Sequence, residues 1–477
     1  MIARYNTLAD SIGQRLDRLA WTPFHTRVAV VLGIGWLLDS FEVSIIANVL
    51  GILKTLWHIT DVQASAMVTV WLAGIMTGAL FFGYLADRFG RRKLFLATLL
   101  LYSTCTVISA PAPGYYFFLV FRFLTAIGVG AEYSAINAAI GELIPARVRG
   151  RATALVMNLW PLGSILAALI SLFLINLLPP TFGWRLAFGL GAIVALFTLW
   201  ARRALPESPR WLLARGRREE AEAVLEQIEA RSTSFATRRT LPEPGLMQRL
   251  GFFHQLAVLL KHHPGRLALA TLLDLSADTG YYGIFAFLPL IVLPRVHIAA
   301  DQVPWFFLIG NVGAFAGGLL VVVLLDTAGR KRTVTLSYLL AAASMMGMGW
   351  ATHAGSAEGV LVSFIIVSFF ATMSWVSAYP TFSEIFPTEL RSTGIGFAVG
   401  VGHVVAGLAP LAVVEIAQRV SVVAAFSMLA AAFMLGVLAM VPWLLFGPEG
   451  RGRSLEALAG VHSRHGHAQT SESRCAT

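Results

Sequence analysis

Long apolar runs separated by short polar connections make up most of the chain. We count twelve runs of about 18–28 residues, each long enough to cross the ~30 Å hydrocarbon core of a bilayer as a tilted helix. Most connections are so short that consecutive helices must run antiparallel. The predicted membrane-spanning helices cover residues 27–52, 64–86, 94–112, 115–143, 151–178, 184–204, 265–293, 302–325, 333–352, 357–383, 391–418 and 420–446.

One long polar segment interrupts this pattern. Residues 205–264 separate the sixth and seventh apolar runs, so we predict two six-helix bundles, residues 27–204 and 265–446. The polar ends, residues 1–26 and 447–477, are predicted to be a cytoplasmic N-terminus and a disordered cytoplasmic tail. The predicted fold class is therefore an all-α membrane protein.

The linker contains one amphipathic stretch. Val224, Leu225 and Ile228 fall on one helical face, and charged residues surround the rest. We expect a short surface helix here, acting as a spacer or in gating.

Composition supports a membrane class. The chain is 57% hydrophobic and 13% charged, with a mean hydropathy of +0.71, whereas soluble domains carry about a quarter charged residues. The polar N-terminus indicates no cleavable signal peptide. Cys105 and Cys475 suit neither a disulfide framework nor a metal site.

The distribution of Lys and Arg predicts the orientation. With the N-terminus inside, most cations face the cytoplasm, as the positive-inside rule requires. The net charge of +10 is then explained by cytoplasmic loops, and we predict no nucleic-acid partner. The exceptions are Lys54, Arg185, Arg295 and Arg419 outside, and Arg122 within a helix. We expect a multi-pass protein of the cell membrane (inner or plasma) with both termini cytoplasmic.

Three short patterns repeat about half a chain apart, each at the same cytoplasmic point of its half. Three matches in register indicate an internal duplication, and the two bundles should be pseudo-symmetric. The pairs are Asp87-x-x-Gly90-Arg91-Arg92 with Asp326-x-x-Gly329-Arg330-Lys331, Glu142-x-x-Pro145-x-x-x-Arg149 with Glu384-x-x-Pro387-x-x-x-Arg391, and Pro206-Glu207 with Pro448-Glu449.

The stretch at residues 83–93 fits the Gly-x-x-x-Asp-Arg-x-Gly-Arg-Arg pattern, and essentially the whole chain resembles the major facilitator superfamily. Residues 206–212 look like the sugar-porter signature. Arg122 with Gly128 and Gly130 is similar to a pattern of proton-coupled members, and Gly128-x-Gly130-x-Glu132-Tyr133 resembles metabolite/proton symporters and their synaptic-vesicle-protein-like relatives.

Two further stretches bear on the substrate. Asp39-Ser-Phe-Glu42 is similar to an acidic stretch of aromatic-acid/proton symporters. Sugar porters carry a Gln-x-x-Ser-Gly-x-Asn-type run in the seventh helix, where this chain has Asp274-Leu-Ser-Ala-Asp278. The departure favours a substrate other than a sugar.

Ionisable side chains inside the apolar runs are candidates for proton coupling. A charge at mid-bilayer costs at least about 2.5–3.5 kcal/mol, so each should face a partner or a cavity. The resemblance implies that an acid of the first helix pairs with Arg122; we favour Asp39, while depth alone leaves Glu42 open. The proton-coupling candidates are Asp39, Glu42, Arg122, Glu132 and Asp278. A static bridge in a uniporter is the alternative.

Aromatic and amide side chains are the candidates for substrate binding. The resemblance places the cavity among the first, fourth, seventh and tenth helices. Such side chains suit a flat or hydroxylated organic ligand, although they also pack between helices. The candidates are Trp36, Tyr133, Asn137, Tyr281, Tyr282, Asn311, Trp375, Tyr379 and His403.

Charged residues at the cytoplasmic helix ends are candidates for gating. Carboxylates and guanidiniums there can form bidentate pairs, and a network could bias one conformation by a few kcal/mol; in the alternative they only enforce topology. The candidates are Asp87, Arg88, Gly90, Arg91, Arg92, Glu142, Arg149, Glu207, Asp326, Arg330, Glu384, Arg391 and Glu449.

The predicted function is secondary transport of a small organic metabolite by alternating access, coupled to protons. A carboxylate, including aromatic acids, is the favoured substrate; a sugar or polyol transporter, and a transporter-like receptor without coupling, are the alternatives. No nucleophile–base set, phosphate loop or metal-ligand cluster is evident in the sequence, so we predict neither an enzyme nor a bound cofactor or metal. The expected partners are the solute, protons and the lipid bilayer, and the chain is expected to be a monomer.

Overall fold

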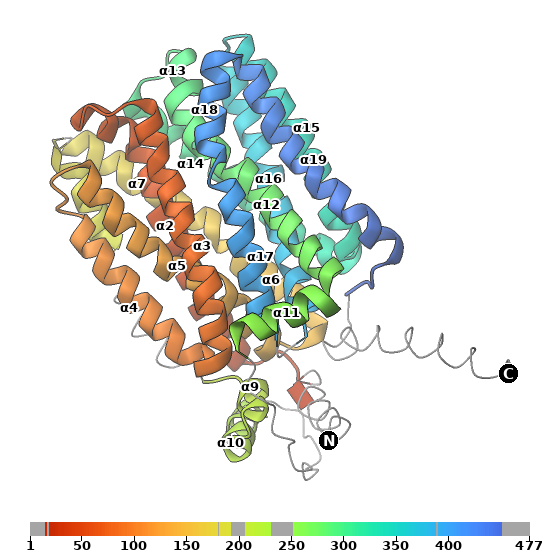
Figure 1. The fold of residues 1–477 in the computed structure, drawn as a ribbon. Helices are drawn as coiled ribbons and strands as arrows, with labels where there is room; N and C mark the ends of the chain where they lie inside the picture. Colours follow the sequence, from red (N-terminus) through yellow and green to blue (C-terminus); the bar gives the residue numbers. More distant parts are fainter. Residues whose placement is uncertain are drawn as a thin grey trace.

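The computed structural model describes residues 15, 16, 19–179, 181–191, 206–229, 251–387 and 390–450, and within them the chain is helical with no strand. Long helices run side by side in one bundle (Figure 1). The first half contains α2 (Pro23–Leu56), α3 (Asp61–Phe89), α4 (Arg91–Ser109), α5 (Tyr115–Leu143), α6 (Ala146–Met157), α7 (Leu159–Leu177) and a helix over residues 181–191.

The second half repeats this arrangement. Its elements are α12 (Pro264–Phe287), the π-helical η1 (Leu288–Val292), α13 (Leu293–Arg295), the 3₁₀ turn η2 (Ala300–Gln302), α14 (Val303–Thr327), α15 (Arg330–His353), α16 (Ala357–Ile385), α17 (Arg391–Ala406), α18 (Ala409–Arg419) and α19 (Val422–Phe446). Ten helices or helix pairs of the described residues are long and apolar enough to span a membrane. Of the other two predicted spans, the third has a shorter apolar helix, and the sixth is described only over residues 181–191.

Two predicted helices are each broken in two, a detail that the apolar pattern did not predict. The fifth splits into α6 and α7, and the eleventh into α17 and α18. Proline explains both breaks, because it has no N–H for the carbonyl four residues earlier and its ring clashes there. Pro161 follows Met157, the last residue of α6, by four positions, and Pro410 follows Ala406, the last residue of α17, by the same interval.

Glycines allow the closest helix contacts in the first half. A β-carbon on Gly130 of α5 would lie 2.1 Å from the carbonyl oxygen of Ile75 in α3, and one on Gly78 would lie 2.1 Å from that of Ile127. Small residues permit such backbone approach inside a membrane, where the hydrophobic effect does not drive helices together. Between the halves, α3 packs on α17 and α7 packs on α14.

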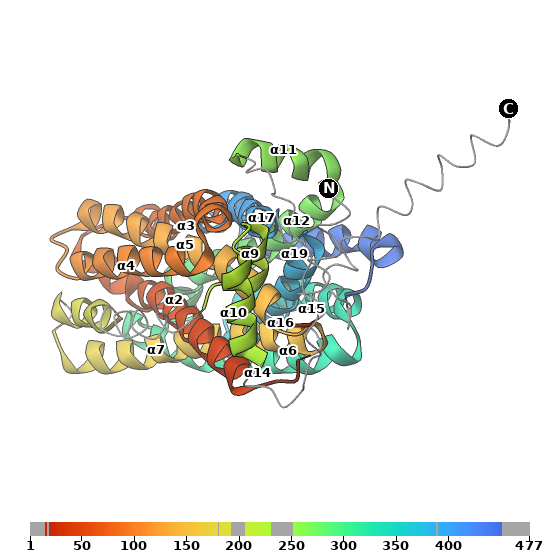
Figure 2. The same cartoon turned by 90° about the horizontal axis from the view of Figure 1, so that it is seen from below.

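The linker forms more structure than predicted. The expected amphipathic helix is α10 (Arg218–Glu229), with Leu225 and Ile228 buried. Arg15 donates two hydrogen bonds to Glu229, at 2.9 and 2.6 Å, and ties the N-terminal segment to this helix. Two helices were not predicted, α9 (Pro209–Ala214) and α11 (Phe252–His262). Figure 2 shows α9 and α10 across the end of the bundle and α11 along one side.

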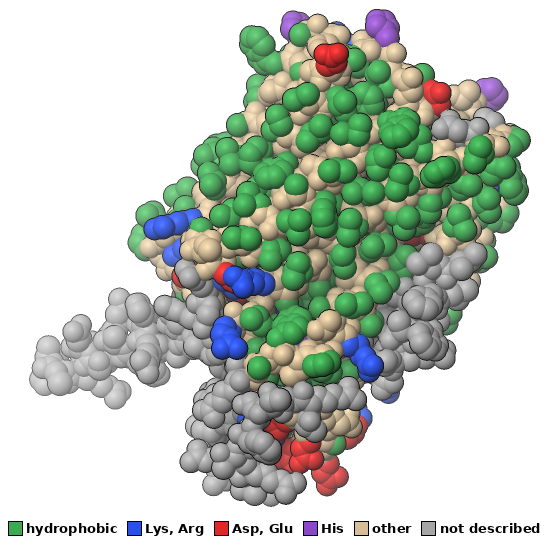
Figure 3. Space-filling view, turned by 180° about the vertical axis from the view of Figure 1, so that it is seen from behind, with side chains coloured by type: hydrophobic (Ala, Val, Ile, Leu, Met, Phe, Trp, Pro, Cys, Tyr) green, Lys and Arg blue, Asp and Glu red, His purple; other side chains and the backbone are tan. Residues whose placement is uncertain are grey.

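Hydrophobic side chains cover the body of the molecule on the face seen in Figure 3, and Lys and Arg side chains gather toward the end that carries α10. Such a surface suits contact with lipid around the body and with water at the ends. The tail predicted to be disordered lies, from residue 451 onward, outside the described residues.

Gly130→Ala should lower the thermal midpoint of the protein in detergent. The added methyl group would meet the Ile75 carbonyl, and overpacking of this kind typically costs about 1–3 kcal/mol. Gly347→Ala in α15 is the matched control, because a β-carbon there has nothing within 4 Å among the described residues. Equal midpoints for the two variants would contradict the close α3–α5 contact.

Candidate substrate and coupling sites

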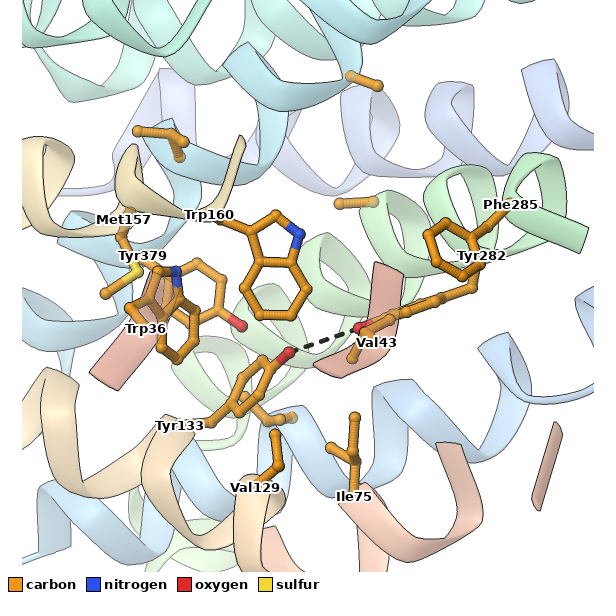
Figure 4. Packing of buried hydrophobic residues seen from close by; sticks show 14 of the residues in the cluster. Trp36, Val43, Ile75, Val129, Tyr133, Met157, Trp160, Tyr282, Phe285 and Tyr379 are labelled. Atoms are coloured by element: carbon orange, nitrogen blue, oxygen red, sulfur yellow. Dashed lines mark hydrogen bonds between the residues drawn. The ribbon is translucent and has the colours of Figure 1, made fainter. Parts of the chain in front are cut away.

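Aromatic side chains from both halves meet at the centre of the bundle. The ring of Trp36 in α2 lies nearly parallel to that of Trp375 in α16, with centroids 5.5 Å apart and an angle of 19° between the planes. Tyr133 of α5 and Trp160 of α7 approach the Trp36 ring at 4.6 and 5.4 Å (Figure 4). Offset and edge contacts of this kind also bind a flat ring well.

Tyrosine hydroxyls supply the polar groups of this centre. The indole N–H of Trp160 donates to the hydroxyl of Tyr281 at 2.9 Å. The hydroxyls of Tyr133 and Tyr282 lie 3.4 Å apart across the two halves, as the dashed line in Figure 4 marks. We call Trp36, Tyr133, Trp160, Tyr281, Tyr282, Trp375 and Tyr379 the aromatic cluster.

The sequence predicted every member of this cluster except Trp160. That residue lies in the fifth predicted span, outside the four helices that the resemblance placed around the cavity. Its neighbour Pro161 was the available signal, because the break that it causes ends α6 beside the cluster.

Two carboxyl groups and one imidazole lie beside the aromatic cluster. Nδ1 of His403 in α17 is 2.9 Å from Oδ2 of Asp278 and 3.3 Å from Oδ2 of Asp274, both in α12. All three side chains are buried, and their donor atoms lie within 4.8 Å of one another. Gly402 makes room for this approach, since a β-carbon there would be 2.5 Å from Asp274 Oδ2. The sequence had proposed Asp278 and His403 for separate roles.

Near the start of α5, Arg122 pairs with Glu42 of α2. Its Nη1 lies 2.7 Å from Glu42 Oε2, and its Nη2 donates to the Glu42 carbonyl at 3.1 Å. Both side chains are 1% exposed. The guanidinium also lies 4.2 Å from the ring centroid of Trp71, a cation–π contact that further stabilises the buried charge.

This pair corrects the predicted Asp39–Arg122 pairing. Arg122 lies near the start of α5, seven residues after its first residue, Tyr115. Glu42 lies one turn nearer the C-terminal end of α2 than Asp39 and has the longer side chain, so its carboxylate reaches Arg122. Asp39 is buried in the same helix.

Other candidates lie outside these two sites or cannot be placed. Asn311 donates to the Phe307 carbonyl of its own helix at 2.7 Å, which satisfies its amide without a ligand. Glu132 is buried in α5. The side chain of Asn137 is outside the described part of the structure.

The end of the bundle that carries α10 has a network of charged residues, several of which were candidates for gating. Arg330 binds Glu384 through two nitrogens, at 3.1 and 3.3 Å, and both side chains are almost fully buried. The carboxylate of Glu449 accepts from the backbone N–H groups of Arg330 and Lys331 at 3.0 and 3.3 Å, and thereby caps the start of α15.

Gly329 and Gly90 precede α15 and α4 with φ of +86° and +102°, a conformation that favours glycine. A β-carbon on Gly329 would lie 3.0 Å from Glu449, and one on Gly90 would lie 2.4 Å from Glu207. The two carboxylates thus occupy equivalent places in the two halves.

Among the described side chains, two ion pairs join the halves at this end. Arg391 of α17 lies 3.8 Å from Glu142 of α5, and Arg151 of α6 pairs with Asp326 of α14. The sequence did not single out Arg151, although it lies two residues after Arg149, which donates to the Ile144 carbonyl in its own half. Arg88 lies over the Phe89 ring. The side chains of Asp87, Arg91 and Arg92 lie outside the described residues.

Two bundles packed around a buried central site, with charged residues at one end, define a multi-pass transporter of the major facilitator type rather than an enzyme. Residues 28–461 match the family described as "Sugar (and other) transporter", and the chain belongs to that family.

Known relatives share nearly the full length of the chain. The niacin transporter NiaP of Acinetobacter baylyi is 30% identical over 448 residues, which is 93% of this chain and 98% of the relative. A putative niacin/nicotinamide transporter of Bacillus subtilis is 29% identical over 89% of this chain and 96% of its own length. Among solved structures, the proton:xylose symporter XylE bound to 6-bromo-6-deoxy-D-glucose superposes with a TM-score of 0.76 at 22% identity, covering 92% of this chain and 99% of XylE. The chain is thus a transporter of small metabolites.

Arg330→Ala should destabilise the protein by about 3–5 kcal/mol, because it leaves the buried Glu384 without its bidentate partner. Thermal or denaturant unfolding in detergent measures the loss. Arg419→Ala is the control, since Arg419 pairs with Glu415 at an exposed helix end, where ion pairs contribute little. A loss no larger than that of the control would show that the Arg330–Glu384 pair does not stabilise the fold.

Proposed function

We propose that the protein is a proton symporter for a small carboxylate, with aromatic acids as the favoured substrates, and that it works by alternating access. The observation that carries the proposal is the fully buried Glu42–Arg122 pair. Ionisable groups at membrane depth are costly, and in transporters they mark proton and substrate pathways.

Glu42 is proposed as the proton carrier. The ion pair with Arg122 exists only while Glu42 is ionised, because a protonated carboxyl group carries no charge. A proton arriving from an acidic exterior neutralises Glu42 and weakens its bond to Arg122. When the protein opens inward, the attraction of Arg122 for the carboxylate favours release of the proton. Asp39, Glu132 and Asp278 remain candidates for further steps of this proton path.

The aromatic cluster is proposed as the substrate site. Its rings already stack on one another, so a flat ring could replace one of these contacts with little loss of free energy. Two relatives are transporters named for niacin, an aromatic carboxylate. A sugar is the second candidate, favoured by the family match.

The cytoplasmic network is proposed as the gate. The ion pairs Arg391–Glu142 and Arg151–Asp326 join the two halves and would have to break for the site to open inward. The Arg330–Glu384 and Glu449 contacts lie within one half, and they would keep the helix ends in place while the halves move.

We further propose that the protein is a monomer in the cell membrane (inner or plasma) with both termini in the cytoplasm. The basic side chains near α10 support this orientation, because positively charged segments are retained inside.

Proteoliposomes containing the protein should accumulate labelled nicotinate when the exterior is acidic. One proton per substrate would allow about tenfold accumulation per pH unit of gradient. Labelled xylose under the same gradient is the comparison. Accumulation of xylose but not nicotinate would favour a sugar substrate. Nicotinate uptake that does not depend on the pH gradient would refute symport.

Glu42→Gln should abolish gradient-driven accumulation while substrate exchange across the membrane continues, because the amide cannot carry a proton. Counterflow and accumulation measured in the same vesicles separate the two effects. Glu358→Gln, at an exposed carboxylate near the start of α16, should transport normally. Full accumulation by Glu42→Gln, together with its loss in Asp39→Asn, would move the proton site to Asp39.

A further inference from the structure

Two buried carboxyl groups share a single imidazole, that of His403, as their basic neighbour. Asp274 and Asp278 lie one turn apart on the same face of α12, and the His403 ring from α17 closes over both. Within the described residues, neither carboxyl group forms an ion pair with a Lys or Arg. With both carboxylates ionised, the cluster is negative even when the imidazole is charged.

A buried net charge of this kind favours uptake of protons. Two carboxyl groups that share one buried site do not ionise independently, and their protons belong to the group as a whole. Nδ1 of His403 also lies 2.9 Å from the carbonyl oxygen of Val399, which can only accept, so this nitrogen carries a hydrogen. A nitrogen that carries a hydrogen is not available as a metal ligand. The buried atoms Asp274 Oδ2 and Asp278 Oδ2 have no hydrogen-bond partner among the described residues, and a proton on a carboxyl group would remove part of the cost of burying them.

The three residues lie directly against the aromatic cluster. The Tyr379 hydroxyl donates to Asp274 Oδ1 at 3.4 Å, and the His403 ring lies 5.7 Å from the Tyr133 ring and 5.9 Å from that of Tyr282. Behind them, the hydroxyl of Tyr338 in α15 is bound to the Leu273 carbonyl. Within the described part of the chain, the titratable groups that face the site are thus these four tyrosines, from α5, α12, α15 and α16, together with Tyr281 of α12.

Charge on this site controls which ligands the aromatic cluster can accept. A carboxylate next to two ionised aspartates is repelled, whereas a neutral or positive site admits it. Arg122 is bound to Glu42 and lies eleven residues from Tyr133 along α5, so His403 is the cationic group adjacent to the cluster among the described residues.

We propose that Asp274, Asp278 and His403 form a second proton site, which must take up a proton before a carboxylate can bind in the aromatic cluster. The inference rests on the proposed carboxylate substrate. It assigns an order to the cycle, with the proton first and the anion second, and it separates this site from Glu42, whose proton drives accumulation.

The test is the pH dependence of equilibrium binding to the purified protein in detergent, with nicotinate and its neutral amide nicotinamide as probes. Measured from pH 6 to 10, the dissociation constant of nicotinate should stay constant while the free site holds its proton, and it should then rise, approaching tenfold per pH unit, once the free site has lost it; that of nicotinamide should stay constant throughout. In weakly buffered solution within the rising range, the wild-type protein should take up about one proton per nicotinate bound and none per nicotinamide.

The double substitution Asp274→Asn with Asp278→Asn should flatten the nicotinate profile and keep binding at pH 8, because the amides mimic protonated carboxyls. Asp61→Asn is the control; it removes an acid that pairs with Lys54 near the outer surface and should keep the wild-type slope. The wild-type proton uptake tests the proposal even if the double variant does not fold.

Several results would overturn the proposal. Nicotinate binding without pH dependence or proton uptake would refute the proton site but leave a carboxylate substrate intact. An unchanged slope in the double variant would assign the proton elsewhere, and loss of binding after treatment with a chelator would identify a metal site instead. If nicotinate and a wider set of carboxylates fail to bind at any pH, the proposed function falls and the inference falls with it.

Discussion

The cost of placing charge in hydrocarbon governs this structure. Each buried ionisable group described in detail has a specific partner: Arg122 has Glu42, Asp274 and Asp278 have His403, and Arg330 has Glu384. Breaking such a pair exposes a charge to a medium that cannot solvate it. In the proposed symport mechanism, the same buried contacts would also respond to the arrival of a proton, so the groups that stabilise the fold would be the groups that couple transport to protons.

The internal repeat distributes these interactions differently at the two ends of the molecule. At the end of the bundle that carries α10, the halves keep equivalent features, with Glu207 beside Gly90 and Glu449 beside Gly329. Among the long helices the symmetry is lost, since the first half has an acid–arginine pair and the second has two acids and a histidine. The two halves thus share the same helical scaffold, but each has a different set of buried ionisable groups.

Much of this architecture was predictable from the sequence. The length of the apolar runs predicts membrane-spanning helices, and the placement of Lys and Arg gives an expected orientation. The helix of residues 115–143 was predicted with its observed bounds. The sequence also named as candidates all residues of the aromatic cluster except Trp160. The pairing of Arg122 was not predictable, since Asp39 and Glu42 share a helical face and only the relative depth of two helices decides between them. The contact of His403 with Asp274 and Asp278 depends on how α17 packs on α12, and local sequence patterns do not predict that packing.

The proline breaks in α6–α7 and α17–α18 have a mechanical consequence. At each break the carbonyls of Met157 and Ala406 are already without the usual N–H donor from Pro161 and Pro410. Each break therefore has one helical hydrogen bond fewer than an intact helix, which lowers the cost of bending the chain there. In the proposed alternating-access cycle, α7 and α18 would tilt at these breaks while α6 and α17, next to the ion pairs that join the halves, would hold their positions.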